Sequence, residues 1–302
     1  MTEHIPVLLK EVAEGLALKK GDTALDATVG GGGHAAEICS RIGETGILVG
    51  VDMDEAALRR AEAQALRGGC TARFSKVNFR NLDVVLEKEG IREIDKALFD
   101  LGMSSFELEA SGRGFSFRRD EPLLMTFDSD PNYGTLTAEE IVNKWDEAAI
   151  AHILREYGEE RFSGRIAQAI VMRRAEKRIE RTVELAEIVN ASIPARFRRG
   201  DSPAKTFQAL RIAVNDELDA LREGLMKATE RLASGGRIAV ISFHSLEDRI
   251  AKQYFRGLAA QGGFVVLTKK PIVPSAEETG RNPRARSAKL RIIEKERIGY
   301  SV

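Results

Sequence analysis

The stretch TALDATVGGGGHAAEI, residues Thr23 to Ile38, constrains the fold of this chain more than any other. A short apolar strand reaches Asp26, four glycines follow at positions 30 to 33, and a helical pattern begins at His34. Glycines allow a tight turn and close approach of a ligand, and an α/β sheet presents nucleotide-like ligands at such a strand-to-helix junction. Residues Gly30 to Ala35 satisfy the pattern G-x-G-x-x-G/A, which alone is a weak signal. The alternative that this is a glycine-rich loop without a ligand therefore stays possible at this point.

A second apolar run strengthens the ligand interpretation. The segment GILVGVDMD, Gly46 to Asp54, is typical of a buried parallel strand that ends at Asp52. Asp52 follows Gly30 by roughly 20 residues, which is the spacing at which an acidic residue meets ribose hydroxyls in dinucleotide-binding units. The loop and Asp52 together therefore predict a ligand that carries a ribose.

The alternation of strands and helices continues through two more strands, then stops, and resumes late in the chain. A third strand, Thr71 to Val77, leads to Phe79, and a fourth, Lys96 to Phe99, leads to Asp100. A fifth strand ends at Ser242-Phe243-His244, and the runs 264–268 and 288–293 would close the sheet as an antiparallel pair. Ligands of open α/β sheets bind outside the carboxyl ends of the strands, where these residues fall. We predict a Rossmann-like α/β fold with a mostly parallel seven-stranded sheet.

The chain between these two blocks of strands has a different pattern. Residues 135–197 have helical periodicity throughout, and RRGDSPAK, residues 198–205, resembles a linker back to the sheet. We predict a discontinuous sheet domain of residues 1–108 and 200–302 and an inserted, mainly helical domain of residues 109–199. A single long helix, Thr206 to Leu232, would follow the linker.

Composition excludes several classes of protein. The net charge is zero, but residues 155–199 hold 11 Lys/Arg against 7 Asp/Glu, and residues 269–297 hold 9 against 4. Cys39 and Cys70 have no C-x-x-C spacing and no nearby histidine cluster, so we expect reduced, packed thiols in a cytoplasmic protein and no metal site. The charged N-terminus lacks the apolar core of a signal peptide, and no apolar run is long enough to span a bilayer.

The carboxylates distinguish between two cofactors that share this kind of fold. A dinucleotide needs its pyrophosphate at a helix N-terminus. S-adenosylmethionine has no phosphate and carries two cations, an α-amino group and a sulfonium. Asp26 before the glycines and Asp100 after the fourth strand would attract those cations and repel a pyrophosphate. The sequence therefore favours S-adenosylmethionine over NAD, and a methyltransferase over an NAD-dependent oxidoreductase.

Long motifs then identify a family. The chain closely resembles the bacterial RsmH (MraW) family of S-adenosylmethionine-dependent methyltransferases, which modify N4 of a cytosine in small-subunit ribosomal RNA. The resemblance covers nearly the whole chain, in HIPVLLKEV, DATVGGGGH, GVDMD, DLGMSS, RGFSF, YGEERF, KTFQALRIAVNDEL, ISFHSLEDR and NPRARSAKLR. It implies a cytoplasmic enzyme that acts on ribosomal RNA within an assembled or nearly assembled small subunit, as a monomer or homodimer, without a membrane.

The resemblance also implies where the cofactor is held. Gly32, Gly33 and His34 would contact the methionine part of the cofactor. Asp52 would contact its ribose hydroxyls and Phe79 its adenine, and Asp100 would lie next to the methyl donor. The predicted cofactor-binding residues are Asp26, Gly31, Gly32, Gly33, His34, Asp52, Phe79, Asp100 and Glu107. The family usually has Gln at position 107, and PLDMRMD where this chain reads PLLMTFD, so Leu124 and Thr126 replace an Asp and an Arg. These departures leave room for a shifted substrate or a weaker activity.

The chemistry of the acceptor suggests catalytic residues. An exocyclic cytosine amine is a poor nucleophile, so catalysis needs an acceptor for its proton and in-line placement. We predict Asp100 in that role, assisted by Ser104 or Ser105, with His244 as a second candidate. Asp100 as a cofactor ligand only, and His244 as a structural residue, stay as alternatives. The predicted phosphate contacts are Arg161, Arg165, Lys205, Arg284 and Arg286. An RNA-binding ribosome assembly factor with a cofactor pocket is the alternative function.

Overall fold

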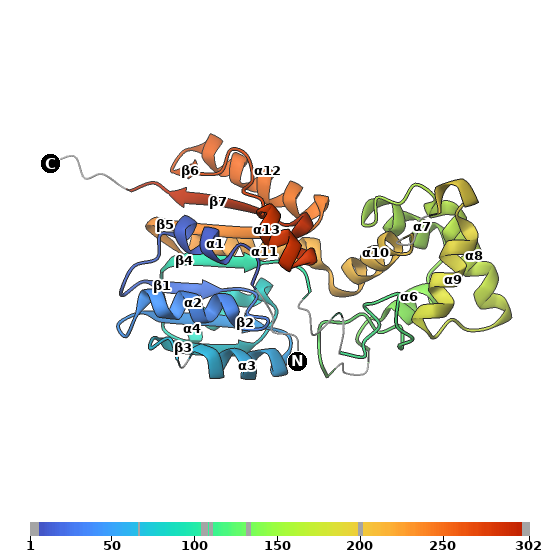
Figure 1. The fold of residues 1–302 in the computed structure, drawn as a ribbon, viewed down its shortest axis with the longest axis horizontal. Coiled ribbons are helices and arrows are strands. Elements are labelled where there is room, and N and C mark those ends of the chain that lie inside the picture. The colour runs from blue at the N-terminus through green and yellow to red at the C-terminus, as the bar shows by residue number, and fades with distance from the viewer. Residues whose placement is uncertain are drawn as a thin grey trace. The chain divides into compact units, whose positions relative to one another are not determined.

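The computed structural model describes residues 6–65, 67–103, 108, 111–130, 134–198 and 202–297. The chain forms two compact units (Figure 1). Residues 1–102 and 218–302 form the first, which we call the sheet unit, and residues 103–217 form the second, which we call the helical unit. Within the described part of the chain, no helix is both long and apolar enough to cross a membrane.

The sheet unit is built on seven strands. They are β1 Thr23–Asp26, β2 Ile47–Asp52, β3 Thr71–Lys76, β4 Ile94–Asp100, β5 Leu232–Ser242, β6 Phe264–Val266 and β7 Lys289–Lys295. Their order in space is β3-β2-β1-β4-β5-β7-β6. Strands β1 to β5 pair in parallel, whereas β7 is antiparallel to both of its neighbours. The predicted mostly parallel seven-stranded sheet with a late antiparallel pair is confirmed.

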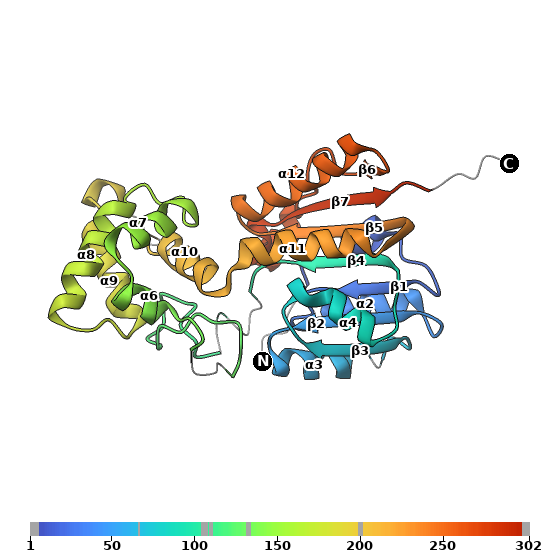
Figure 2. The ribbon, with the colours of Figure 1, turned by 180° about the vertical axis from the view of Figure 1, so that it is seen from behind.

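Helices cover both faces of this sheet (Figures 1 and 2). One face carries α1 Leu9–Leu16, α2 Gly33–Ile42 and α3 Glu55–Ala65, and the short helix α13 Ala276–Arg281 comes before β7. The other face carries α4 Leu82–Lys88, α11 Glu217–Glu230 and α12 Ser245–Gln261. Each layer packs its own apolar core on the sheet: Ile38 and Ile42 of α2 lie in one cluster, and Leu225 and Phe255 lie in the other. Strands buried on both faces explain the near-continuous apolar runs in the sequence.

The helical unit has a separate core. Its helices are α6 Ala138–Lys144, α7 Glu147–Glu156, α8 Ser163–Glu176, α9 Thr182–Ser192 and α10 Ala204–Asn215. Apolar side chains of all five meet in one cluster, among them Ile141, Leu154, Ile170, Val189 and Leu210. The insertion is therefore mainly helical, as the periodicity indicated.

The helix expected from Thr206 to Leu232 is instead two helices. Asp216 adopts a left-handed conformation with φ 49° and ends α10, and α11 begins at Glu217. Phe207 and Leu210 of α10 pack into the core of the helical unit, so the boundaries lie at 102/103 and 217/218 rather than at 108/109 and 199/200. The periodicity of α10 and α11 shows that each has an apolar face, but not which core that face joins.

The expectation for the cysteines was also wrong. The structure joins Cys39 of α2 to Cys70, the residue before β3, in a disulfide, with their Cα atoms 5.0 Å apart. Gly68 makes the approach possible, since a Cβ on it would lie 2.6 Å from the Cβ of Cys39. The two cysteines are 31 positions apart, and nothing in the sequence between them indicated that the chain returns to the same place.

Candidate active site

Three aspartates mark the carboxyl edge of the sheet. Asp26, Asp52 and Asp100 are the last residues of β1, β2 and β4, which are neighbours in the order β2-β1-β4. The strand order reverses direction between β1 and β4, and ligands of open α/β sheets bind at such a switch point. The sheet therefore brings together the three carboxylates that the sequence singled out.

The glycine loop is held in place by Asp52 and by close packing. The N–H of Gly30 donates to Oδ2 of Asp52 at 2.8 Å, while Oδ1 of Asp52 accepts from the N–H of Asp54. Gly32 is the N-cap residue of α2, with φ 83°, and a Cβ there would lie 2.6 Å from Cα of Ala61. A Cβ on Gly33 would lie 2.2 Å from Pro6. Gly32 and Gly33 are thus required by the packing of the loop, whatever ligand it holds. Gly31 lies between Gly30, which Asp52 holds, and Gly32.

Asp26 and Asp100 are linked through one threonine. Oδ1 of Asp26 accepts from the N–H of Thr28 at 3.1 Å, and Oγ1 of Thr28 accepts from the N–H of Asp100 at 2.6 Å. Asp26 is fully buried, and burial raises its pKa to about 7. Sequence reasoning missed Thr28, because its part in the site becomes visible only once β1 and β4 are adjacent.

Two carboxylate oxygens in this group lack a hydrogen-bond donor. They are Oδ2 of Asp26 and Oδ1 of Asp100, both buried and both without a partner within the described residues. Burial, the Asp26 carboxyl and Glu247 raise the pKa of Asp100 well above its usual range. Buried acceptors without donors are costly, so the group is suited to a ligand that brings N–H donors or positive charge.

His34 completes the group from the other side of the loop. It lies in the first turn of α2, is only 6% exposed, and its Nε2 lies 3.6 Å from Oδ2 of Asp100. An imidazole that close to a carboxylate favours the ionised form of the carboxylate when the imidazole is protonated. The structure thus places His34 beside the residue predicted to accept a proton.

Phe79 lies beyond the end of β3, in a one-turn 3-10 helix, Phe79–Asn81, that Asn78 caps. Its ring meets Phe99 edge to face, with ring centroids 5.7 Å apart, and a Cβ on Gly224 would lie 2.8 Å from it. The ring is therefore partly used in packing and stays only half-buried. Its contact with an adenine stays a prediction.

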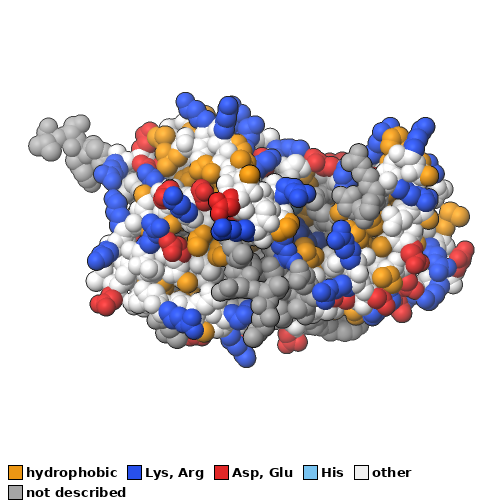
Figure 3. Space-filling model, viewed as in Figure 1, with side chains coloured by type: hydrophobic (Ala, Val, Ile, Leu, Met, Phe, Trp, Pro, Cys, Tyr) orange, Lys and Arg blue, Asp and Glu red, His pale blue; other side chains and the backbone are white. Residues whose placement is uncertain are grey.

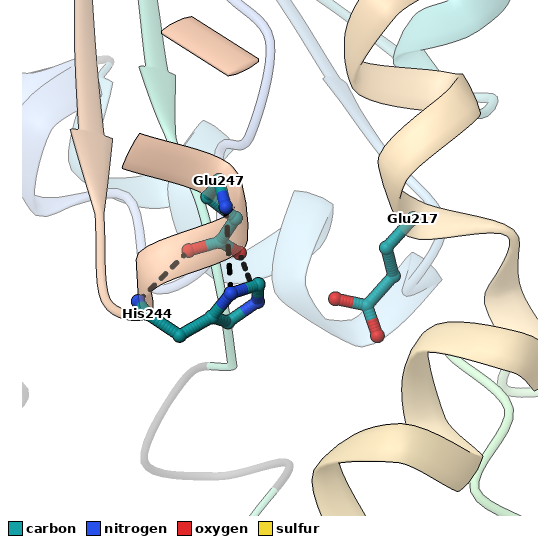
Figure 4. A group of neighbouring side chains, drawn as sticks. All are labelled: Glu217, His244 and Glu247. Atoms are coloured by element: carbon teal, nitrogen blue, oxygen red, sulfur yellow. Dashed lines mark hydrogen bonds and ion pairs between the residues drawn. The ribbon is translucent and has the colours of Figure 1, made fainter. Parts of the chain in front are cut away.

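His244 is engaged in a helix cap (Figure 4). Its Nδ1 accepts from the N–H of Glu247, and its Nε2 lies 3.1 Å from Oε1 of the same residue. The Glu247 carboxylate in turn accepts from the N–H groups of Phe243 and His244. These bonds form a capping box at the start of α12. His244 therefore caps α12, and Glu247, three positions later in SLED, was the sequence signal for that cap. The part of His244 in catalysis stays a prediction.

The remaining candidates are distributed over both units. Ser104, Ser105 and Glu107 lie outside the described residues. Arg161, Arg165 and Lys205 are exposed in the helical unit, whereas Arg284 and Arg286 lie in the 3-10 turn Pro283–Ser287 of the sheet unit, where only Arg286 is exposed. Glu217, also drawn in Figure 4, ends the helical unit and pairs there with Arg211 through two hydrogen bonds.

The segment that departs from the family pattern is firmly held. Arg113 donates to the carbonyls of Thr126 and Phe127, and Asn215 donates to the carbonyl of Met125. Asn215 also accepts from the N–H of Phe127 at 2.8 Å. Thr126 is 3% exposed, so its hydroxyl serves the turn and accepts from the N–H of Asp128. Asn215 thus orients this loop.

Known proteins give a consistent comparison. The family model described as the MraW methylase family matches residues 1–296. The Ribosomal RNA small subunit methyltransferase H of Heliobacterium modesticaldum is 48% identical, over 97% of this chain and 98% of its own. That of Symbiobacterium thermophilum is 47% identical, over 98% of each. A crystal structure described as an rRNA methylase from Streptococcus thermophilus is 15% identical, with a TM-score of 0.43, over 96% of this chain and 94% of its own.

Proposed function

The chain belongs to the MraW methylase family, and from that premise we propose that it transfers a methyl group from S-adenosylmethionine to N4 of a cytidine in small-subunit ribosomal RNA. The relatives that carry the name ribosomal RNA small subunit methyltransferase H support the RNA substrate, because they match nearly the whole chain at 44% to 48% identity. The acceptor atom rests on the motif resemblance. A ribosomal substrate would place the protein in the cytoplasm.

One observation supports this chemistry most directly: Asp26 and Asp100, at the strand ends beside the glycine loop, each have a buried carboxylate oxygen to which no described residue donates a hydrogen bond. S-adenosylmethionine supplies an electrophilic methyl group, and its amino group and sulfonium provide the positive charge that these oxygens lack. A pyrophosphate would face two buried acidic groups there. Asp52 fits a ribose less simply, because both its oxygens already accept backbone hydrogen bonds. A carboxylate oxygen has two lone pairs, so it still has room for a hydroxyl donor.

We assign to Asp100 the role of accepting the proton that the cytosine amine loses during methyl transfer. Its pKa is raised by burial, by Asp26 and by Glu247, so its ionised form is a stronger base than an exposed aspartate. His34, 3.6 Å away, favours that ionised form when it is protonated. The bond from the N–H of Asp100 to Thr28 fixes the end of β4, so the carboxylate keeps its direction during the transfer.

The test is transfer of labelled methyl from S-adenosylmethionine to small ribosomal subunits from a strain that lacks this protein. Label should appear as N4-methylcytidine, and assembled subunits should accept more label than naked RNA. Asp100→Asn keeps the shape of the side chain and removes the base, so turnover should fall at least about 100-fold. No transfer by the wild type to either substrate would contradict the proposal and favour an RNA-binding assembly factor.

A titration tests the cofactor separately. Calorimetry of the wild type should give binding of S-adenosylmethionine and none of NAD, because NAD would place its pyrophosphate near Asp26 and Asp100. The matched variant Asp26→Asn should weaken S-adenosylmethionine binding through the lost charge. Binding of NAD alone would overturn the assignment.

A further inference from the structure

Three segments of the helical unit that are far apart in the sequence meet at its surface. The turn before α8 contributes Arg161 and Phe162, and the 3-10 turn Ala195–Phe197 packs on it with the rings of Phe162 and Phe197 5.5 Å apart. The start of α10 joins them, because Nζ of Lys205 donates to the carbonyl of Glu159 at 2.9 Å. The Phe197 patch consists of Arg161, Phe162, Arg165, Arg196, Phe197 and Lys205.

Phe197 is unusual among the side chains on this surface. It is 39% exposed, and within the described residues it is the one aromatic among the exposed large hydrophobic side chains. Two guanidinium groups lie over its ring, that of Arg161 at 5.2 Å and that of Arg196 at 4.9 Å from the centroid. The patch therefore presents a partly exposed aromatic ring together with two guanidinium groups that lie over it.

The arginines of the patch differ from other arginines of the same unit. Arg173, Arg178 and Arg181 pair with Glu176, Glu139 and Asp120 at 2.7 to 3.1 Å. Arg161, Arg165 and Arg196 are exposed, and the described part of the chain offers them no carboxylate within ion-pair distance. On the face of the molecule in Figure 3, by contrast, blue and red side chains are largely interspersed over the sheet unit. Among the described residues, Arg161, Arg165 and Arg196 thus have no ion-pair partner that would compete with a phosphate.

We propose that the Phe197 patch binds a single-stranded segment of RNA, with an unpaired base stacked at Phe197 and the flanking phosphates bound by Arg161, Arg165, Arg196 and Lys205. Aromatic rings and guanidinium planes are the surfaces on which unpaired bases stack, and unpaired arginines near them bind the backbone. A duplex has its bases stacked internally, so it offers no free base face to an aromatic ring. This inference rests on the proposed RNA substrate, and it identifies a part of the protein that recognises it.

The experiment measures binding of a short single-stranded RNA oligonucleotide by fluorescence anisotropy, with the full chain, at several salt concentrations. Phe197→Leu keeps the apolar contact with Phe162 and removes the aromatic face, so binding should weaken about 5-fold or more. Arg196→Gln should weaken binding and reduce the slope of log K against log salt by about 0.7. Arg173→Gln and Arg178→Gln, which remove ion-paired arginines of the same unit, should bind as the wild type does.

Each contrary result has a defined meaning. If the Phe197→Leu variant binds the oligonucleotide as tightly as the wild type does, the proposal for the Phe197 patch is overturned. The proposal is also overturned if a polyglutamate peptide displaces the labelled oligonucleotide as well as unlabelled RNA does, because that result would indicate a docking surface for an acidic protein. Thermal unfolding of each variant shows that it is folded. Methyl transfer to small subunits, measured in parallel, separates the two proposals: a wild type that transfers methyl while both patch variants bind RNA normally overturns the patch alone.

Discussion

The Nε2 atom of His34 lies 3.6 Å from Oδ2 of Asp100, although His34 lies in the first turn of α2 and Asp100 ends β4. The pair joins the loop that is expected to hold the cofactor to the group that is expected to take the proton. Asp100 is otherwise surrounded by acidic neighbours, since Asp26 and Glu247 both raise its pKa. His34 is thus the residue of this group that can offset them.

Replacement of His34 should therefore move the pH dependence of methyl transfer. Asp100 works as a base only when ionised, so activity falls as the pH drops through its pKa. Without the imidazole, the ionised form is less favoured and the acidic limb of kcat/KM should shift to higher pH in His34→Asn. A pH profile of wild type and variant measures the shift. If the acidic limb of kcat/KM lies at the same pH in the variant and the rate is lower by the same factor at every pH, His34 serves only to pack against Asp100.

Asp26 should make the protein less stable as the pH rises. Its pKa is about 7 in the folded chain, against 3.8 for an unperturbed aspartate, so the folded state holds its proton where the unfolded state has lost it. The free energy of unfolding should fall from about pH 4 to about pH 7, by on the order of 4 kcal/mol at most, and then level off. Denaturant unfolding at several pH values checks this. Asp26→Asn should remove most of that slope, and an identical slope in the variant would refute the assignment.

Gly32 should tolerate a methyl group far less well than a glycine in open space. Gly32→Ala must adopt φ 83° and also place its Cβ against Ala61 of α3. Gly90→Ala has a similar φ of 70° but nothing within 4 Å, so it carries only the backbone cost. The first variant should lose at least about 1 kcal/mol more in the free energy of unfolding than the second. Equal losses would mean that the loop moves away from α3 without cost.

A cap-preserving change at His244 should leave methyl transfer largely intact. Asparagine is a favoured N-cap residue, so His244→Asn should keep α12 capped and keep the melting temperature within a few degrees. Because the imidazole is bound by Glu247, its loss should reduce kcat less than about 10-fold. A loss of about 100-fold or more in a stably folded variant would restore His244 as a catalytic residue.

Much of the fold was predictable because local patterns reported it directly. Apolar runs that end in Asp52 and Asp100 gave the strands, and the glycines after Asp26 gave the turn into α2. The predictions that failed did so for different reasons. The meeting of Cys39 with Cys70 depends on a contact between distant segments, whereas the break at Asp216 is a local turn that apolar periodicity does not report.

The sequence by itself determined the parallel sheet, the helical insertion, the family and the three aspartates at the strand ends, because alternation, glycine content and motif spacing are local properties. Only the tertiary structure decided what those residues do to one another. It set Thr28 between Asp26 and Asp100 and placed His34 beside Asp100. It also left one oxygen of each aspartate without a donor among the described residues. It also brought Arg161, Arg196 and Phe197 together. Burial and distance act between residues that are remote in the chain, and they exist only once the chain has folded.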